Sequence, residues 1–429
     1  MNPVHSLRDR SIAIAGAGVS GLAAAHRLRK WGAKVTIFEK SDVVGGRTRS
    51  LRSDGFTIDL GALMMMPTYK NVIALAHELG IEKHLIATRP VISIVRERRH
   101  HELDMRRQIR SALSMKLISV PSAFKLLKLL PVIARHWSTF HYENMGELAS
   151  LDDETVHDFC QRELNEEIET WIASPLIRAG SLTGTREAPI GDWLWQAVGF
   201  RYPTVLQWDQ GMDFFAQSLA KGQLVRLGAM VTSVRDDDGR AVVQVREGAV
   251  LREETFDACL LAMPTTVSRC IAPSMSLPQS EFFDNLHGVP MISLHLGLRA
   301  QPASKASMIL IPEQESADIM MILLDHNKVD GRTPPGKGIC TIWSTKEWTR
   351  ANTDSSDERV TIDLCRLAEP FVGKVRPLIE FSHIERRDFV VHRLILAFLL
   401  GCETTWQPVT LINRFSSPET SALRELKAQ

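Results

Sequence analysis

The alternation of apolar and polar positions is clearest in the first forty residues of the chain. Residues 11–15 form a short, mostly apolar run, which predicts a buried strand. Residues 22–31 carry apolar side chains at helical spacing and stop before Gly32, so they predict an amphipathic helix. A second apolar run at 34–39 predicts another strand. Strand, helix and strand in this order are typical of a βαβ unit with parallel strands.

The same patterning continues along the chain and predicts an α/β protein. Residues 230–236 and 241–246 flank an Asp-Asp-Gly-Arg turn, which is typical of a hairpin, and 224–227 is interpreted as the strand that pairs with 230–236. Asp152 or Asp153 is the expected cap of a helix at 155–164. Further helices are predicted at 71–79, 166–172 and 357–371, and further strands at 256–264, 291–298, 307–312, 318–324 and 338–344.

Length and charge narrow the class of protein. A chain of 429 residues is long for one core, so two or three lobes are expected. With 51 basic and 50 acidic side chains the net charge is +1, which argues against nucleic-acid binding. The cysteines lack Cys-x-x-Cys spacing and the histidines lack His-Glu-x-x-His spacing, so neither a disulfide framework nor a metal site is predicted. Without a cleavable signal or an apolar run of about 18 residues, a cytoplasmic location is expected.

A glycine-rich turn joins the first predicted strand to the first helix. Its sequence, Gly16-Ala-Gly-Val-Ser-Gly21, has the spacing of a dinucleotide-binding loop. Gly16 permits a tight turn, Gly18 lets the backbone approach a pyrophosphate, and Gly21 lets the helix pack closely on the strand. Val19 and Ser20 stand at the start of the helix, where free N–H groups and the positive end of the dipole favour a phosphate.

The glycine loop leaves the choice between NAD and FAD open. The residues at and after the end of the second predicted strand bear on that choice. Glu39, 18 positions after the last glycine, is placed to accept hydrogen bonds from a ribose diol. The chain continues through Lys40 to Gly45-Gly46-Arg47, and this combination resembles the flavin-containing amine oxidase superfamily, which includes protoporphyrinogen oxidases and phytoene desaturase-like enzymes. The resemblance implies that FAD is the cofactor, that Lys40 belongs to the binding segment and that Gly46 and Arg47 follow the diphosphate and ribityl chain. Independently, paired glycines allow close backbone approach and an arginine can bind phosphate bidentately.

Three later segments extend the resemblance. Gly61 and Ala62 belong to an Asp-x-Gly turn that the superfamily places near the flavin ring. Val231 lies in a hairpin that the superfamily uses to hold the adenine, and Ala262 and Pro264 lie in a segment that passes close to the cofactor. This order implies an interrupted Rossmann-like FAD-binding domain, a mixed-sheet substrate domain and a helical insertion. The expected boundaries are 1–66 and 205–272 for the FAD-binding domain, 67–204 for the helical lobe, 273–390 for the substrate domain and 391–429 for an atypical C-terminal segment.

Two departures from the superfamily pattern bear on the substrate. Many amine oxidases place a lysine on the strand that faces the flavin N5, whereas residues 291–298 contain no lysine and offer His295 as the candidate catalytic residue. Amine oxidases also use an aromatic cage, often with tyrosines, and this chain has only three tyrosines. We therefore expect the flavin to dehydrogenate a lipophilic small molecule rather than to oxidise a primary amine. The methionines at 64–66 either line an apolar substrate cavity or belong to an ordinary core.

The stretch 91–137 leaves a membrane role open. Residues 91–110 are interpreted as a strand followed by a solvated hairpin, or as a patch for anionic lipid headgroups or substrate carboxylates. Residues 114–137 mix apolar runs with spaced cations, and Pro121 and Pro131 divide them into short helices. Three interpretations of these helices stay open: they lie on a membrane surface, they roof a lipophilic tunnel, or they pack inside a helical lobe. Peripheral membrane contact and the oligomeric state both stay open.

The C-terminal segment departs from the superfamily pattern. Members usually end with a strand, an Ala-Gly-Asp-like turn and a glycine-rich helix start beside the flavin, and 394–429 contains neither of the last two. Cys402 stands in a segment faintly similar to the one that binds flavin covalently in monoamine oxidases, and we expect a structural thiol there. Two alternatives to an oxidoreductase follow: a non-redox, flavin-dependent isomerase with a lipophilic substrate, and a degenerate FAD-fold protein without catalysis.

Overall fold

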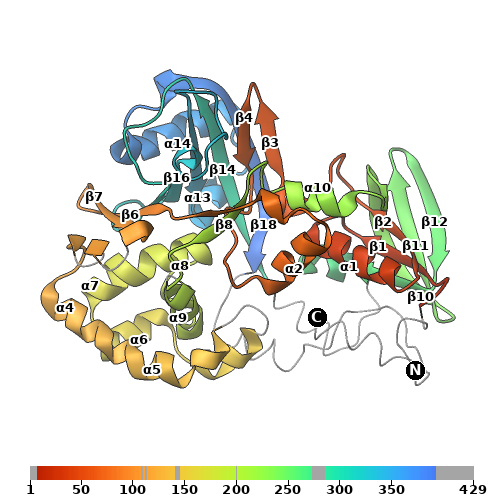
Figure 1. Ribbon diagram of the computed structural model, residues 1–429, viewed down its shortest axis with the longest axis horizontal. Coiled ribbons are helices and arrows are strands. Elements are labelled where there is room, and N and C mark those ends of the chain that lie inside the picture. The colour runs from red at the N-terminus through yellow and green to blue at the C-terminus, as the bar shows by residue number, and fades with distance from the viewer. Residues whose placement is uncertain are drawn as a thin grey trace.

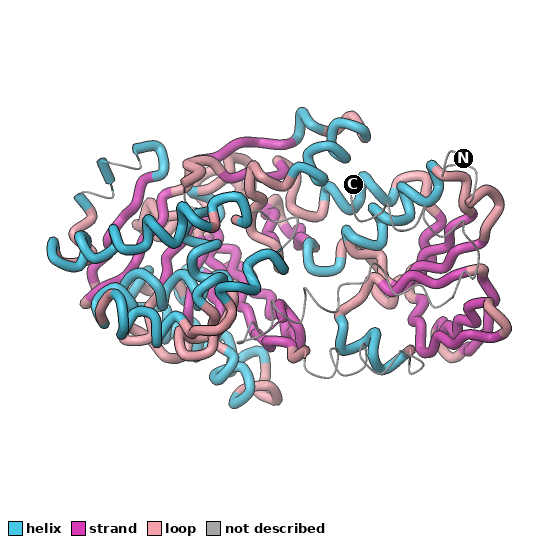
Figure 2. The backbone as a smooth tube through the Cα atoms, turned by 90° about the horizontal axis from the view of Figure 1, so that it is seen from below, coloured by secondary structure: helices cyan, strands magenta, loops and turns pink. Residues whose placement is uncertain are grey.

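The computed structural model describes residues 7–107, 110–111, 114–140, 145–199, 201–272 and 286–392. Figure 1 shows one half of the molecule built on a small parallel sheet at the right, and a larger sheet above a lobe of helices at the left. Seen from below in Figure 2, the two halves again lie side by side along the long axis. Tyr142 and the segment 393–429, with Cys402, lie outside the described residues, so the expectations for them stay expectations.

The predicted βαβ unit is present near the N-terminus. β1 (Ser11–Ala15) pairs in parallel with β2 (Lys34–Phe38), and α1 (Val19–Lys30) connects them. β13 (Ala258–Leu261) joins the other side of β1, and β9 (Leu224–Arg226) extends the sheet beyond β2. Two of these four parallel strands come from residues after 220, so the predicted interruption of the Rossmann-like domain is confirmed.

One predicted strand pairing is wrong. β9 pairs with β2, whereas β10 (Ala229–Asp237) pairs antiparallel with β11 (Arg240–Glu247) in a separate sheet. Gly228, with a φ of +66°, lies between β9 and β10, and the free edge of β2 accepts β9. The hairpin turn between β10 and β11 is confirmed, and its Asp238 and Gly239 both have the positive φ that a two-residue hairpin turn requires.

The prediction of a single strand at 256–264 is also wrong. This run contains the end of β12 (Val250–Phe256), which completes the three-stranded sheet, and then β13. Asp257 separates the two strands because its carboxylate accepts hydrogen bonds from the backbone N–H (2.7 Å) and the hydroxyl (2.8 Å) of Ser11. β12 was missed because most of its side chains are exposed and the middle of the strand, Arg252–Glu254, is charged, so it lacks an alternating apolar pattern.

The larger sheet has seven strands in the order β18-β14-β17-β16-β15-β6-β7. It is mixed, because β15 and β6 pair in parallel and every other pair is antiparallel. One of its apolar clusters includes side chains of α13 (Lys346–Ala351) and α14 (Asp357–Val372). The strands are β6 (Val91–Arg96), β7 (Arg99–Asp104), β14 (Gly288–Leu298), β15 (Met308–Leu310), β16 (Ile319–Leu323), β17 (Gly338–Ser344) and β18 (Ile379–His392).

Shorter elements connect the two halves. α10 (Phe214–Ala220) and α2 (Lys70–Glu78) share an apolar core with α1, and β5 (Leu85–Thr88) pairs with β8 (Val205–Trp208) beside them. A hairpin of β3 (Ser50–Ser53) and β4 (Phe56–Asp59) packs Phe56 and Ile58 against Ile339 of the larger sheet. The two halves are therefore joined by several separate segments of the chain.

The helical lobe has its own core, which encloses Trp193 completely. Thr155, rather than Asp152 or Asp153, caps its third helix, because the Thr155 hydroxyl accepts a hydrogen bond from the Asp158 N–H at 3.0 Å. The helix predicted at 166–172 is a short α-helix followed by a π-helical segment at Glu169–Ala173. The helices of the lobe are α4 (Val120–Lys125), α5 (Leu129–Arg135), α6 (Val156–Glu163), α7 (Glu166–Ile168), α8 (Ser174–Gly180) and α9 (Ile190–Gly199).

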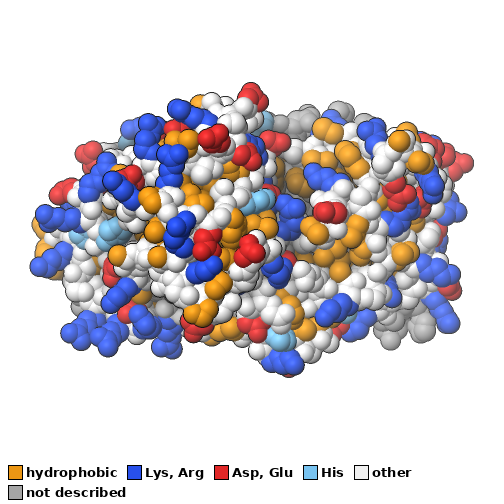
Figure 3. Space-filling view, turned by 90° about the horizontal axis from the view of Figure 1, so that it is seen from above, with side chains coloured by type: hydrophobic (Ala, Val, Ile, Leu, Met, Phe, Trp, Pro, Cys, Tyr) orange, Lys and Arg blue, Asp and Glu red, His pale blue; other side chains and the backbone are white. Residues whose placement is uncertain are grey.

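The surface is mixed in charge. On the face in Figure 3, basic, acidic and apolar side chains are interspersed, in keeping with the net charge of +1. Among the helices that the structure describes, none combines the length and the apolar character needed to cross a bilayer.

Candidate dinucleotide-binding site

The three glycines of the loop after β1 occupy different surroundings. Gly16 has a φ of +107°, and a Cβ there would lie 2.5 Å from the carbonyl oxygen of Ala262. A Cβ on Gly21 would lie 2.1 Å from the carbonyl oxygen of Gly16. Gly18 has an ordinary φ of −72°, and a Cβ there would meet no described atom within 4 Å. Gly16 and Gly21 are therefore required by the fold, whereas the space beside Gly18 is open to a ligand.

The carboxylate of Glu39 faces the same loop from the end of β2. It is buried, and it accepts hydrogen bonds from the backbone N–H groups of Ala17 at 2.8 Å and Ser41 at 3.0 Å. These contacts fix the carboxylate beside the loop that leads into Val19 and Ser20, the first residues of α1. Each carboxylate oxygen keeps a further lone pair for a hydroxyl donor such as a ribose diol. Lys40, next in the chain, is exposed.

Two further turns adjoin the glycine loop. Gly18 and Gly45 form a parallel β-bridge, so the Gly45-Gly46-Arg47 turn lies directly against the loop. The N–H of Ala62 donates to the carbonyl oxygen of Arg47 at 2.9 Å, and a Cβ on Gly61 would lie 2.1 Å from that oxygen. Loop, Gly-Gly-Arg turn and Gly61–Ala62 turn thus form one continuous backbone surface.

The later segments reach the loop to different extents. Ala262 donates from its N–H to the carbonyl oxygen of Ala15 at 2.8 Å and packs against Gly16. Pro264 follows as the N-cap of α11 (Thr265–Ile271). The side chain of Val231 is buried in the core between β2 and the three-stranded sheet. The structure therefore brings Ala262 to the glycine loop and places Val231 in the apolar layer behind it.

Three arginines lie close to the Gly61 turn, and two of them contact one carboxylate. Arg49 donates to Glu385 Oε1 at 2.9 Å, and Arg387 Nη2 lies 3.1 Å from the same oxygen. Arg47 lies close enough for its charge to lower the pKa of Arg387, although burial is the larger cause. Burial alone would raise the pKa of Glu385, but the hydrogen bond to His383 and the charges of Arg387 and Arg49 lower it to about 2. Two guanidinium groups at one carboxylate, with the charge of Arg47 close to Arg387, leave an excess of positive charge at the turn.

The residues present fit a flavin dinucleotide. The fit rests on the open space at Gly18, the buried Glu39 and the half-buried Arg49 and Arg387. Among the described residues, Nε of Arg387 has no hydrogen-bond partner. An anionic diphosphate or a flavin carbonyl oxygen would supply the acceptor that this cluster lacks. Arg387 and Glu385 were missed at the sequence level; the only signal was a Glu-Arg-Arg run inside an otherwise ordinary strand pattern.

A buried polar cluster ties the larger sheet to the segment that carries the Gly61 turn. Lys328 Nζ lies 2.8 Å from Asp325 Oδ1 and donates to the carbonyl oxygen of Leu63 at 2.9 Å. Arg332 Nη1 donates to Asp59 Oδ1 at 3.3 Å, and its Nη2 donates to the carbonyl oxygen of Trp208 at 2.8 Å. These hydrogen bonds and ion pairs fix both ends of the segment from Asp59 to Leu63, and Gly61 lies in the middle of that segment. The sequence did not predict a role for either cation, because both stand in a turn-rich stretch whose charged residues are expected to be exposed to solvent.

The candidate catalytic residue His295 is enclosed in the larger sheet. Its Nε2 is hydrogen-bonded to the Ser293 hydroxyl at 2.8 Å and its Nδ1 lies 3.2 Å from the Thr341 hydroxyl. Burial, followed by the nearby His383, lowers the pKa of His295 to about 3. The ring is therefore neutral at ordinary pH with both nitrogens engaged, and no nitrogen is free for a substrate.

This neutral, buried histidine predicts a pH dependence of stability. Its folded pKa of about 3 lies below the unfolded value near 6.5, so its contribution is complete above pH 6.5 and is lost as the pH falls. We expect the free energy of unfolding to fall by up to about 1.4 kcal/mol per pH unit between pH 6 and pH 4 from this residue. Urea denaturation of wild type and His295→Gln should show a shallower pH slope in the variant. The exposed His77→Gln is the control, and equal slopes in wild type and His295→Gln would contradict the assignment.

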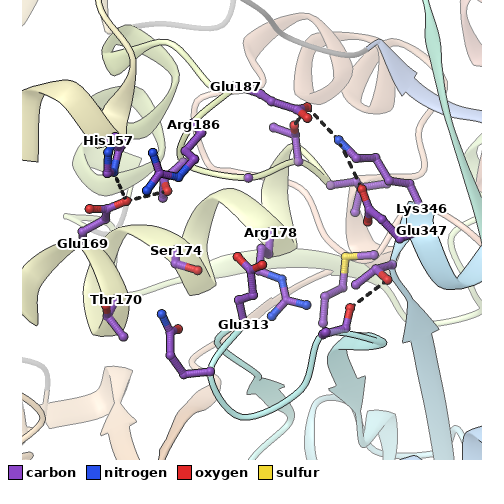
Figure 4. Close-up of a pocket in the computed structure, with 18 of the residues that line it drawn as sticks. His157, Glu169, Thr170, Ser174, Arg178, Arg186, Glu187, Glu313, Lys346 and Glu347 are labelled. Atoms are coloured by element: carbon purple, nitrogen blue, oxygen red, sulfur yellow. Dashed lines mark hydrogen bonds and ion pairs between the residues drawn. The ribbon is translucent and has the colours of Figure 1, made fainter. Parts of the chain in front are cut away.

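A separate pocket of about 720 Å³ lies between the helical lobe and the larger sheet (Figure 4). Several of its charged groups pair with one another: Glu169 is hydrogen-bonded to His157 at 2.8 Å, and Lys346 donates to Glu187 at 2.6 Å. Arg178 donates to main-chain carbonyl oxygens, and its burial lowers its pKa to about 10. This lining does not suit an apolar substrate, so the glycine loop and the turns beside it remain the candidate site.

A parallel sheet with a glycine loop, a buried acid at the end of the second strand and an open path at Gly18 defines a dinucleotide-binding protein of the Rossmann type. The chain belongs to the family of flavin containing amine oxidoreductases, whose model matches residues 19–415. The predicted family is thereby confirmed, and so is a flavin, in the form of FAD, as the cofactor of the fold.

The matching stretch of curated relatives is short. Over 66 residues the chain is 56% identical to 4,4'-diapophytoene desaturase (4,4'-diaponeurosporene-forming) from Staphylococcus aureus strain MRSA252, which is 15% of this chain and 13% of that protein. The same enzyme from strain USA300 is 57% identical over 63 residues, or 14% of this chain and 12% of that protein. The chain thus matches only about an eighth of the length of these relatives.

Solved structures share the whole fold at low identity. A putative protoporphyrinogen oxidase from Exiguobacterium sp. 255-15 is 15% identical with a TM-score of 0.71, over 91% of this chain and 89% of that one. Wild-type putrescine oxidase bound to putrescine is 18% identical with a TM-score of 0.71, over 94% and 92%. A CLA-producing fatty acid isomerase from P. acnes is 17% identical with a TM-score of 0.65, over 89% and 86%. At these identities the likeness shows the fold alone, and it confirms the predicted fold class.

Proposed function

We propose that the chain is an FAD-dependent oxidoreductase that dehydrogenates a lipophilic small molecule. The cofactor would lie with its diphosphate at Gly16, Gly18 and Gly21 and its ribose at Glu39. Gly45, Gly46 and Arg47, with Gly61 and Ala62, would follow it toward the flavin ring, and Ala262 and Pro264 would border it. When bound, FAD supplies the hydride acceptor. The expected domain boundaries belong to the same proposal, with β6 and β7 contributing to the substrate sheet.

The observation that carries the lipophilic substrate is an apolar layer beside the Gly61 turn. Leu63 and Met64, the residues after Gly61 and Ala62, pack against a cluster between the larger sheet and the helical lobe. Seven of the chain's 15 methionines belong to or pack against this cluster. Thioether side chains are flexible and adapt their packing to an apolar guest. The protein's own part in the reaction would be to exclude water and to hold an apolar C–H bond at the flavin, without an obligatory protein base.

This layer also bears on two open points from the sequence. Met64 packs against this buried cluster and Met65 belongs to the core under α1 and α2, as the interpretation of an ordinary core expects. A substrate cavity beside Met64 belongs to the proposal. A lipophilic substrate would be drawn from a membrane, so peripheral membrane contact in a reducing, cytoplasmic setting belongs to the proposal. The oligomeric state is not part of it.

The first experiment is an absorption spectrum of the purified protein before and after acid precipitation. We expect flavin bands that remain in the supernatant, as for non-covalently bound FAD. Anaerobic addition of a long-chain polyene or an unsaturated fatty acid should then bleach the flavin, while primary amines of similar length should not. Product formed without consumption of an oxidant would favour the isomerase alternative. The fatty acid isomerase of the same fold suggests an unsaturated fatty acid as the substrate to test for that alternative. A protein that stays colourless with added FAD would contradict the proposal.

A further inference from the structure

The segment from Ser119 to Trp137 forms a helical arm with two apolar faces. α4 and α5 are joined through a short 3-10 turn whose residues keep right-handed helical angles, so the arm is almost continuous. Its inner face packs Leu126, Leu129 and Ile133 into the core of the helical lobe. Its outer face carries exposed apolar side chains at spacings of four and three residues: Val120, Phe124, Leu127 and Leu130, followed by Trp137.

The outer face is unusual for a water-exposed helix. Its five large apolar side chains are 55–70% exposed, and they lie within 18 positions, whereas the whole described chain has 13 exposed large apolar side chains. A surface helix of a water-soluble protein normally turns one apolar face to the core and a polar face to solvent. α4 and α5 lie at the lower left margin of the molecule in Figure 1, with no described element outside them. The arm therefore has an apolar face that the described chain does not cover.

The charge carried by the segment that contains this face is of one sign, and the acids packed against it, Glu163 and Glu167, come from the neighbouring helices α6 and α7. Residues 105–142 contain seven lysines and arginines and no aspartate or glutamate, although the chain as a whole has a net charge of only +1. Lys116 and Arg135 are exposed, whereas Lys128, one helical turn after Phe124, lies 3.5 Å from Glu163. An exposed apolar stripe flanked by basic residues matches a bilayer surface with anionic lipid headgroups.

We propose that the arm 119–137 docks this protein on the surface of an anionic membrane, with Phe124, Leu127 and Trp137 entering the headgroup region. The inference deepens the proposed function by naming the surface through which a lipophilic substrate would arrive. Binding itself does not depend on turnover, so it can be measured separately from activity.

The test is co-flotation of the full-length protein with vesicles of phosphatidylcholine alone or mixed equally with phosphatidylglycerol. We expect binding at least about tenfold tighter to the mixed vesicles, since each basic side chain near an anionic surface contributes about fivefold. High salt should weaken it. Phe124→Ser with Leu127→Ser should weaken binding to mixed vesicles by about tenfold or more. Lys116→Gln with Arg135→Gln should remove most of the preference for anionic lipid.

The matched control is Leu224→Ser with Leu251→Ser, which removes two exposed leucines away from the arm and should leave vesicle binding unchanged. Unchanged binding in the arm variants would overturn the inference. So would a lipid-free dimer, seen by sedimentation velocity, that the same arm variants dissociate, because the occupant would then be a second copy. An active flavoprotein that does not bind vesicles would refute only the proposed docking surface. A colourless protein that binds vesicles would refute only the proposed oxidoreductase function.

Discussion

Gly18→Val is expected to yield a folded protein that no longer retains flavin. The new side chain has room in the structure, because no described atom lies within 4 Å of the position of its Cβ, and the φ of −72° at Gly18 is ordinary for valine. The space that the side chain would fill is the one where the pyrophosphate must approach the start of α1. An overpacking cost of about 3 kcal/mol corresponds to about 100-fold weaker FAD binding.

Two other glycine variants separate this effect from a folding defect. Gly21→Ala places its methyl group against the carbonyl oxygen of Gly16 and should lower the free energy of unfolding as well as flavin content. Gly184→Val is the matched control, because its Cβ also meets open space and its φ is not in the left-handed region. The measurement is flavin stoichiometry by absorbance together with urea denaturation of each protein. Full flavin occupancy in Gly18→Val would place the diphosphate elsewhere.

The glycine loop illustrates why the first part of the site could be predicted from the sequence. Strand, turn and helix are consecutive, so their geometry depends on contacts within about thirty residues. The tight turn at Gly16 and the close packing at Gly21, both expected from the motif, are present in the structure. The strands of the larger sheet were also located closely, since each is an apolar run between turn residues. Local sequence patterns were therefore sufficient to predict the glycine loop and the strands of the larger sheet.

Partners across long sequence separations could not be predicted in the same way. The runs before and after Gly228 both read as strands, but periodicity does not specify which strand each one joins. Nothing in the pattern of 379–392 indicates that Glu385 and Arg387 face the Gly61 turn, because that depends on the register of β18 against β14. The acid 325 and the cations at 328 and 332 stand in a stretch rich in glycine and proline, where charged residues are normally exposed. Their burial results from the assembly of three distant segments.

Arg332 is the residue of this assembly whose loss should destabilise the protein most. Its guanidinium and the carboxylate of Asp59 are each 2% exposed, and Asp59 also accepts from the Ser50 hydroxyl at 2.6 Å and the Met212 N–H at 2.9 Å. Arg332→Met would leave the Asp59 carboxylate buried without its cation. Breaking a buried pair in this way typically costs about 3–5 kcal/mol. We expect a loss of that size in the free energy of unfolding by urea denaturation.

The same substitution at the surface provides the control. Arg235 pairs with Glu253 at 3.1 Å, but the two side chains are about half exposed, so Arg235→Met should cost less than about 1 kcal/mol. Asp59→Asn combined with Arg332→Met should be less destabilised than the sum of the single variants, because the unpaired charge is removed. Additive losses would show that the two side chains stabilise the fold independently. Because Asp59 and Leu63 bracket the Gly61 turn, a true pair should also lower flavin retention in Arg332→Met, whereas Arg235→Met should retain flavin fully.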